Sequence, residues 1–221
     1  MNYNNIICFD LETGGLNTST AQIVQIGAVA IDGRRLEVIP NSKFDILIKP
    51  LYGEEAATAG LEELGDGAIR IHGKTHEILS KKGVSLSTAL SNFKEYTASY
   101  SSGKGQWKRP IASGYNIVNY DLPILNRDLA SKKITNLFHP RDVLDVLNMM
   151  FLFFENDKNV SSLSVDNLLR KHMGGSTDGA HDALGDVLLT ADVMCRSLRL
   201  IRRAVGKVNF EGCLNVSSDE I

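Results

Sequence analysis

The feature that most constrains this chain is an apolar strand that ends in two carboxylates. The run IICF at positions 6–9 predicts a buried strand, and Asp10 and Glu12 follow it directly. Side chains two apart in a strand share a face, so both acids point the same way, with Leu11 opposite. Adjacent carboxylates repel, and each is costly to desolvate unless it is protonated, paired or bound to a cation.

A divalent metal is the economical partner for this pair. The nearest Lys or Arg in the sequence is Arg34, and carboxylate oxygens are hard ligands that suit magnesium or manganese. The alternative is a polar strand end that binds nothing. With 15 Asp and 11 Glu in 221 residues, roughly 0.7 Asp-x-Glu pairs arise by chance. The pair alone therefore leaves both interpretations open.

Length and charge describe an ordinary soluble chain. At 221 residues and 43% hydrophobic, the chain is long enough for one well-packed domain and short for two. The net charge of −2 argues against a strongly basic protein that coats nucleic acid.

Cysteines and the first residues indicate an intracellular, cytoplasmic protein. Cys8, Cys195 and Cys213 are odd in number and widely spaced, which fits neither a disulfide framework nor zinc spacing. The segment 1–9 has no basic region, and its apolar run is too short for a signal peptide or a membrane span. We therefore expect no membrane partner.

Periodicity predicts strands first and then helices. Segments 6–12, 22–31 and 43–49 are rich in β-branched and apolar residues and predict a three-stranded meander. The remaining predicted elements are helices at 86–97, from near 121, at 144–154, 163–172 and 182–204, and a short strand at 111–117. This order favours a single α/β domain with a mixed sheet. We place the domain at 1–205 and a polar tail at 206–221.

Later segments offer further acids and a histidine. Asp121 starts a helix after the short strand, and its alternative role is a helix-capping aspartate. Asp182 and Asp186 lie four apart on one helix face, which could equally be a solvated face. His181 follows the glycine-rich stretch GGSTDGA, so we place it on the approach to that helix, where it could reach what Asp186 holds. The alternative is an exposed histidine in a loop.

Three motifs together resemble one enzyme family. FDLETGGL, YNIVNYDLPIL and HDALGDV are similar, in this order, to the three motifs of the DEDDh family of 3′→5′ exonucleases. That family includes the proofreading epsilon subunit of bacterial DNA polymerase III and ribonuclease T. The segments IHGKTHEIL, VLDVLNM and SLSVDNLLRKHMG resemble further stretches of the family. The similarity covers about residues 5–195.

The resemblance implies a fold, a metal site and a base. The fold would be a ribonuclease H-like mixed β-sheet flanked by α-helices. Two Mg²⁺ ions, for which Mn²⁺ can substitute, would be held by four carboxylates. A histidine would act as general base. The matching residues are Asp10, Glu12, Asp121 and Asp186 for the ions and His181 for the base.

The resemblance also implies a substrate and its contacts. The activity would be removal of nucleoside 5′-monophosphates from single-stranded or frayed 3′ ends of DNA, with RNA as an alternative. Thr13 and Gly14 would approach the terminal sugar, Leu16 and His72 would flank the terminal bases, and Asn116 would line the pocket. Besides nucleic acid, a polymerase or a second copy of the chain are the partners that the family suggests.

Two positions differ from the family pattern, and two other functions remain alternatives to a 3′→5′ exonuclease. Tyr115 stands where the family often has His, and Gln25 where it frequently has an acid. The segment 101–110, SSGKGQWKRP, is either an electrostatic guide for the strand or a solvated loop. The rival functions are an oligonucleotide or nucleotide phosphohydrolase and a nucleic-acid-binding polymerase accessory of the same fold.

Overall fold

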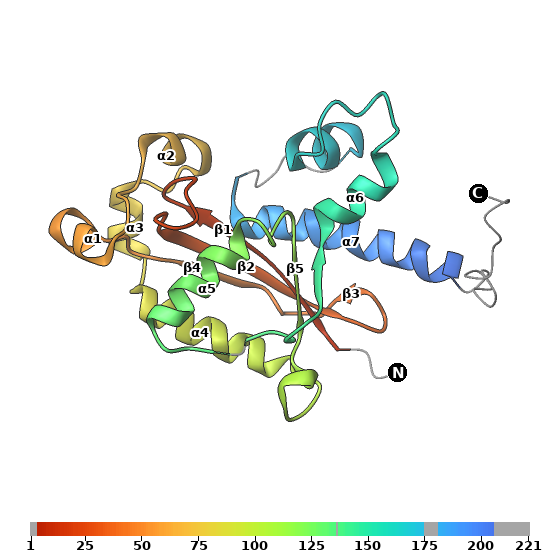
Figure 1. The fold of residues 1–221 in the computed structure, drawn as a ribbon, viewed down its shortest axis with the longest axis horizontal. Coiled ribbons are helices and arrows are strands. Elements are labelled where there is room, and N and C mark those ends of the chain that lie inside the picture. The colour runs from red at the N-terminus through yellow and green to blue at the C-terminus, as the bar shows by residue number, and fades with distance from the viewer. Residues whose placement is uncertain (1–3, 136, 175–180, 206–221) are drawn as a thin grey trace, which may run out of the picture.

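A six-stranded mixed sheet forms the centre of the computed structural model, which describes residues 4–135, 137–174 and 181–205 (Figure 1). The strand order is β3-β2-β1-β5-β6, and β4 pairs with β2 beside this path. The strands are β1 (Ile6–Thr13), β2 (Ile23–Asp32), β3 (Glu37–Val38), β4 (Phe44–Leu47), β5 (Ile111–Gly114) and β6 (Val143–Asp145). β1 is antiparallel to β2 and parallel to β5, so it is paired along both edges.

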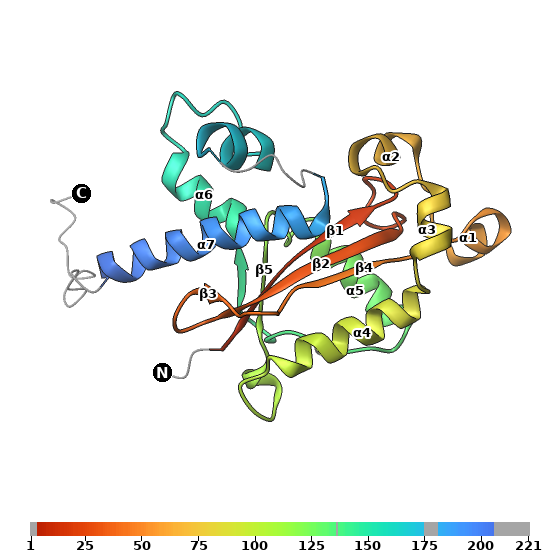
Figure 2. The same ribbon diagram turned by 180° about the vertical axis from the view of Figure 1, so that it is seen from behind.

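Helices cover both faces of the sheet. They are α1 (Gly53–Ala59), α2 (Asp66–His72), α3 (His76–Lys82), α4 (Leu86–Ser99), α5 (Asp121–Ser131), α6 (Val146–Phe154) and α7 (Ala183–Val205), with a 3₁₀ turn η1 (Gln106–Lys108) and a π-helical segment η2 (Val165–His172). Figure 2 shows the long helix α7 crossing the sheet, with α6 and η2 beside it.

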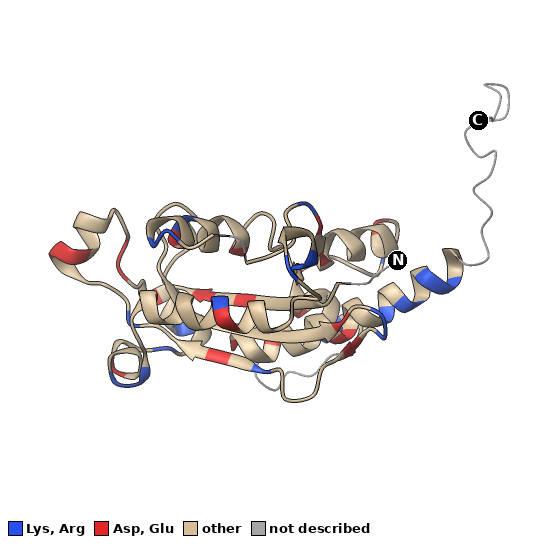
Figure 3. Cartoon of the chain, turned by 90° about the horizontal axis from the view of Figure 1, so that it is seen from below, with Lys and Arg blue, Asp and Glu red and all other residues tan. Residues whose placement is uncertain are grey.

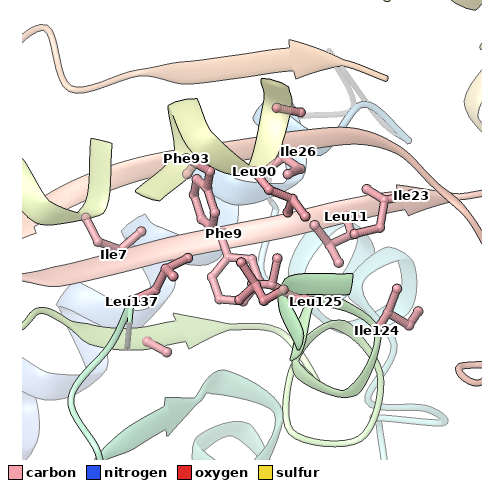
Figure 4. Close-up of a cluster of buried hydrophobic side chains, with 14 of the residues drawn as sticks. Ile7, Phe9, Leu11, Ile23, Ile26, Leu90, Phe93, Ile124, Leu125 and Leu137 are labelled. Atoms are coloured by element: carbon pink, nitrogen blue, oxygen red, sulfur yellow. The ribbon is translucent and has the colours of Figure 1, made fainter. Parts of the chain in front are cut away.

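Alternation along β1 divides the core into two layers. Ile7, Phe9 and Leu11 face α4 and α5, and the ring centroids of Phe9 and Phe93 lie 5.9 Å apart (Figure 4). Ile6 and Cys8 face the other way and pack with residues of α6, η2 and α7. Burial of each large apolar side chain stabilises the fold by roughly 1.5–3 kcal/mol. The even-numbered side of β1 is therefore the α7 side.

The predicted α/β class with a mixed sheet is confirmed, and so is the meander, since β2 pairs with both β1 and β4. The strand predicted over 111–117 is too long. It ends at Gly114, because Asn116 adopts φ 60°, a left-handed conformation that ends a strand and that Asn tolerates.

The helix predicted over 144–154 starts too early. Residues 143–145 pair with β5 as the parallel strand β6. Asp145 then caps α6, because its Oδ1 accepts the Leu147 N–H at 3.0 Å.

Several elements have no counterpart in the sequence prediction. The helices α1, α2 and α3 have seven residues each, too short to show a clear apolar period, and β3 has two residues. The segment 163–172 is a π-helical turn over 165–172, which periodicity cannot distinguish from an α-helix. The predicted tail 206–221 lies outside the described residues. Within the described ranges, no helix is both long and apolar enough to cross a membrane.

Candidate active site

The acids of β1 meet an acid of α7. Asp10 and Glu12 continue the even-numbered side of β1, and Asp186 lies in the first turn of α7. One carboxylate oxygen from each of the three lies within 4.8 Å of the others. The Asp186 side chain is only 16% exposed, so its alternative as part of a solvated face is wrong. The two acids of β1 therefore form one cluster with Asp186 of α7.

Asp121 joins this region from α5. It is buried, and its Oδ1 accepts the backbone N–H of Leu11 at 2.9 Å. The alternative role of a helix-capping aspartate does not account for this contact with a strand, and the N-cap residue of α5 is Tyr120. Burial, followed by the charge of Asp121, raises the pKa of Asp10 well above its usual range.

Repulsion and burial disfavour charge at all four acids. Burial, then the charge of Asp186, raises the pKa of Glu12 to about 8, and burial raises the pKa of Asp121 to about 7. Burial also raises the pKa of Asp186, against the opposing charge of Arg170. Converging hard oxygen ligands whose negative charge is poorly compensated fit a divalent ion such as Mg²⁺ or Mn²⁺.

Two cations stand beside the acids. The Arg170 guanidinium is buried and bonds Asp186 through Nη2 and Asp166 through Nη1. Lys74 Nζ lies 2.8 Å from Asp182 Oδ1 and lowers the pKa of Glu12 against the larger effect of burial. Sequence reasoning missed both residues, although each lies in a segment that resembles the exonuclease family.

His181 lies directly before α7, as predicted. Its φ is 58°, its side chain is 42% exposed, and its Nε2 lies 3.8 Å from Asp166 Oδ2. Its charge also lowers the pKa of Asp186, after the larger effects of burial and Arg170. The stretch 175–180 before it lies outside the described residues. The role of His181 as a base stays a prediction.

Gln25 ties the start of α7 to the sheet. Its Nε2 donates to Asp45 Oδ1 at 2.8 Å and to Asp182 Oδ1 at 3.0 Å. Its Oε1 accepts the Ala183 N–H at 3.3 Å. A Cβ added to Gly27 would lie 2.5 Å from the carbonyl carbon of Ala183. Gln25, which departs from the family pattern, thus holds the start of α7 close to β2.

A cavity of about 440 Å³ opens beside Glu12. It is lined by the end of β1, the following turn, α2 with its N-cap, and the N-cap residue of α5, namely Leu11, Glu12, Thr13, Gly14, Gly15, Leu16, Gly65, Gly67, Ala68, Ile71, His72 and Tyr120. Four of the five predicted substrate contacts therefore line one cavity. Asn116 is not among these lining residues, and its backbone N–H donates to Asp145 Oδ1 at 2.9 Å.

Tyr120, which the sequence reasoning missed, braces the turn after β1. Its hydroxyl lies 2.6 Å from Thr13 Oγ1, and both hydroxyls lie within hydrogen-bonding distance of the Gly15 carbonyl. Gly14 donates to the Gln22 carbonyl at 2.8 Å and its own carbonyl accepts from Gly65 at 2.9 Å. The turn is therefore fixed on both sides. Tyr120 lies directly before Asp121 in the sequence, and this position is the signal that could have identified it.

The insert at 101–110 lies at the far end of β1. The carbonyl of Trp107 accepts from Asn4 Nδ2 at 2.9 Å, before the strand begins, whereas the acids lie near its other end. This placement favours the solvated-loop interpretation over a guide for a strand. Basic positions also gather on the last turns of α7, away from the acids (Figure 3).

Comparison with solved structures gives exonuclease I repeatedly. A structure of exonuclease I matches with a TM-score of 0.71 at 19% identity, covering 96% of this chain and 45% of that chain. E. coli exonuclease I in complex with a dT13 oligonucleotide matches with a TM-score of 0.70 at 19% identity, over 96% of this chain and 46% of that chain. This chain thus spans just under half the length of those proteins.

A third similar structure is the zinc-bound form of an E. coli exonuclease I complex with single-stranded DNA. Its TM-score is 0.70 at 19% identity, over 97% of this chain and 45% of that chain. These likenesses establish the shared fold. Residues 7–194 match the RNase_T family, described as exonuclease, in agreement with the three sequence motifs. The chain belongs to the RNase_T family of exonucleases.

Proposed function

We propose that this chain removes nucleoside 5′-monophosphates one at a time from single-stranded or frayed 3′ ends of DNA. The observation that carries the proposal is the convergence of Asp10, Glu12 and Asp186 beside a cavity at the end of β1. The exonuclease family match supports the reaction class. The similar E. coli exonuclease I structures that contain single-stranded DNA or dT13 support the choice of substrate.

The donor set fits two divalent ions, Mg²⁺ with Mn²⁺ as a substitute. Asp10, Glu12, Asp121 and Asp186 would hold them. Such ions lower the pKa of water and neutralise charge on a phosphodiester. Without them, a negatively charged strand would be repelled by the four acids, so we propose that the ions are required for cleavage.

His181 supplies the proton acceptor in this proposal. It stands two residues before α7, the helix that carries Asp186, and its side chain is partly exposed. An imidazole there can take the proton of the attacking water and pass it to solvent. The buried acids cannot serve this purpose while they hold ions.

The terminal nucleotide binds in the cavity in this proposal. Leu16 and Ile71 expose 87% and 59% of their surface at its rim, which offers apolar faces to a base without reading its identity. The Nδ1 of His72 accepts the Lys74 N–H at 2.9 Å, so a neutral ring carries its proton on Nε2. Burial, followed by the charge of Lys74, lowers the pKa of His72 and keeps the ring neutral.

A 5′-labelled oligonucleotide on a sequencing gel tests the proposal. With Mg²⁺ we expect a ladder that shortens one nucleotide at a time from the 3′ end. Excess chelator should abolish it, and a 3′-terminal phosphate should slow it. Parallel single strands and duplexes of DNA and RNA establish which substrate is preferred.

A matched pair of variants provides the control. Asp186→Asn should remove the ladder, whereas Asp192→Asn, an exposed position on the same helix, should leave it unchanged. Early release of a labelled mononucleotide from the 5′ end, cuts in a circular single strand, or full activity in chelator would each contradict the proposal.

A further inference from the structure

We propose that Arg170 is the resident counter-ion of the metal-free site, and that a divalent ion must displace its guanidinium from Asp186 in order to bind. Arg170 would then set the metal affinity of the site as well as the stability of the metal-free protein. The inference rests on the proposed function, because the ion concerned is the one that the exonuclease reaction requires.

Arg170 is a buried charge with incomplete hydrogen bonding. Its side chain is 5% exposed, and a charge so far from water is costly unless it is paired. Nη2 bonds Asp186, and Nη1 lies 2.5 Å from Asp166 Oδ1. The buried Nε has no hydrogen-bond partner among the described residues. The two carboxylates thus hold the guanidinium in place, although not all of its N–H donors have hydrogen-bond partners within the described part of the chain.

The guanidinium and a metal ion would share one ligand. Asp186 contributes an oxygen to the cluster with Asp10 and Glu12. The Nη2 of Arg170 bonds Oδ1 of the same Asp186 carboxylate. The positive charge of Arg170 also opposes the raised pKa values of Asp186 and Asp10, so its field reaches two of the three clustered acids. A dication placed among these acids would be repelled by a guanidinium in contact with one of them. The two cations therefore compete.

The structure provides a place for the displaced guanidinium. Asp166 lies one helical turn before Arg170 in η2, and its side chain is 49% exposed. The bond to Asp166 can remain when the bond to Asp186 is lost, so Arg170 keeps a carboxylate partner near solvent. A buried charge left without a partner would be strongly destabilising. Asp166 removes that obstacle and makes the exchange of cations feasible.

Titration calorimetry of the full chain with Mn²⁺, without nucleic acid, tests the inference. Arg170→Gln should bind Mn²⁺ about tenfold more tightly than the parent protein, since a hydrogen bond between charged groups no longer opposes the ion. In chelator the melting temperature of this variant should fall by about 5 °C, because three acids then repel without a counter-ion. Addition of Mn²⁺ should restore it.

Two further variants keep the result interpretable. Arg196→Gln removes an exposed Arg–Asp pair on α7 and should change neither the affinity nor the response to Mn²⁺. If Arg170→Gln does not fold without metal, Arg170→Lys takes its place. Lys keeps the charge but cannot bridge two carboxylates as the guanidinium does, so we expect binding about threefold tighter.

The outcomes separate this inference from the proposed function. Unchanged or weaker Mn²⁺ binding in Arg170→Gln, or in Arg170→Lys where that variant is used, would overturn the role of Arg170 while leaving the metal-dependent exonuclease intact. Failure of the parent protein to bind Mn²⁺ or Mg²⁺ at all would overturn both. Tighter binding together with a lower metal-free melting temperature would support the inference.

Discussion

The two walls of the site are built by different physics. The sheet wall carries Asp10 and Glu12 on β1, where the strand is paired with β2, and Asp121, whose carboxylate bonds the Leu11 backbone. The helix wall carries Asp186 at the start of α7, which is held by ion pairs and side-chain bonds from Arg170, Lys74 and Gln25 to Asp186 or its neighbour Asp182.

This difference determines what a substitution changes. Backbone pairing with β2 fixes Asp10 and Glu12 whatever the charge of their side chains, so these two acids remain close together and repel. The helix wall is positioned by contacts of the side chains themselves, so a change there moves the residues as well as altering their charge. Variants of Asp10 and Glu12 should therefore test chemistry alone, whereas variants of the helix-wall acid Asp186 should test chemistry and placement together.

The largest expected effect comes from the sheet wall. Asp10→Asn keeps the shape of the side chain but removes a ligand and a charge, so turnover should fall by about 10⁴-fold, the equivalent of several kcal/mol of lost charge stabilisation. The metal-free melting temperature should stay equal or rise, because repulsion is relieved. Single-turnover cleavage and a thermal melt in chelator measure both. A clearly lower melting temperature would mean that the strand does not fix this wall independently of its charges.

The sheet wall could be predicted from sequence because its signals are local. An apolar strand followed by acids of one parity predicts which face they share, and the structure places them there. Asp121 follows a short strand by seven residues, and its position at the start of a helix was predicted. The contact of its carboxylate with Leu11 joins positions 110 apart, and no local pattern encodes such a contact.

The helix wall shows where sequence reasoning ends. The motif containing His181 and Asp186 was visible, but the cations beside it were not. Arg170 and Lys74 lie in segments whose surfaces look like ordinary polar faces, and they meet the acids only through tertiary packing. The π-helical turn that carries Arg170 and the short α2 that lines the cavity were also beyond the reach of a periodicity argument.

His181→Ala should give the next largest effect and tests chemistry on the helix wall. Loss of a general base lowers turnover by about 10²–10⁴-fold, while binding of the strand should change little because the ions hold the phosphate. The pH–rate profile of the parent protein should fall toward acidic pH, and the variant should lose that limb. A variant with an unchanged rate and profile would assign the base to another group.

Gly27→Ala tests placement on the helix wall without touching a ligand. The new Cβ would lie 2.5 Å from backbone atoms of residues 183 and 184, so the start of α7 must shift away from β2. A shift of about 1 Å costs roughly 10²-fold in turnover. Gly103→Ala, whose Cβ would have its nearest neighbour in the Lys108 side chain at 3.5 Å, is the control. Equal turnover in both variants would show that the helix wall tolerates displacement.

The smallest expected effect is a pH dependence of the metal-free stability, and its sign follows from the raised pKa values. Glu12, with a pKa of about 8, and Asp121, with a pKa of about 7, titrate near 4 in an unfolded chain. Between about pH 4.5 and 8 the folded protein therefore binds more protons than the unfolded chain, so its stability falls as pH rises.

In chelator we expect the melting temperature to drop by about 5 °C between pH 5.5 and pH 8.5. Saturating Mg²⁺ should reverse the slope, because metal ligands must lose their protons to bind. Glu12→Gln should flatten the metal-free curve, whereas Asp186→Asn should change its slope less, since Arg170 already compensates Asp186. Equal flattening by the two variants would contradict the difference between the walls, because Glu12 and Asp186 would then be equally uncompensated in charge.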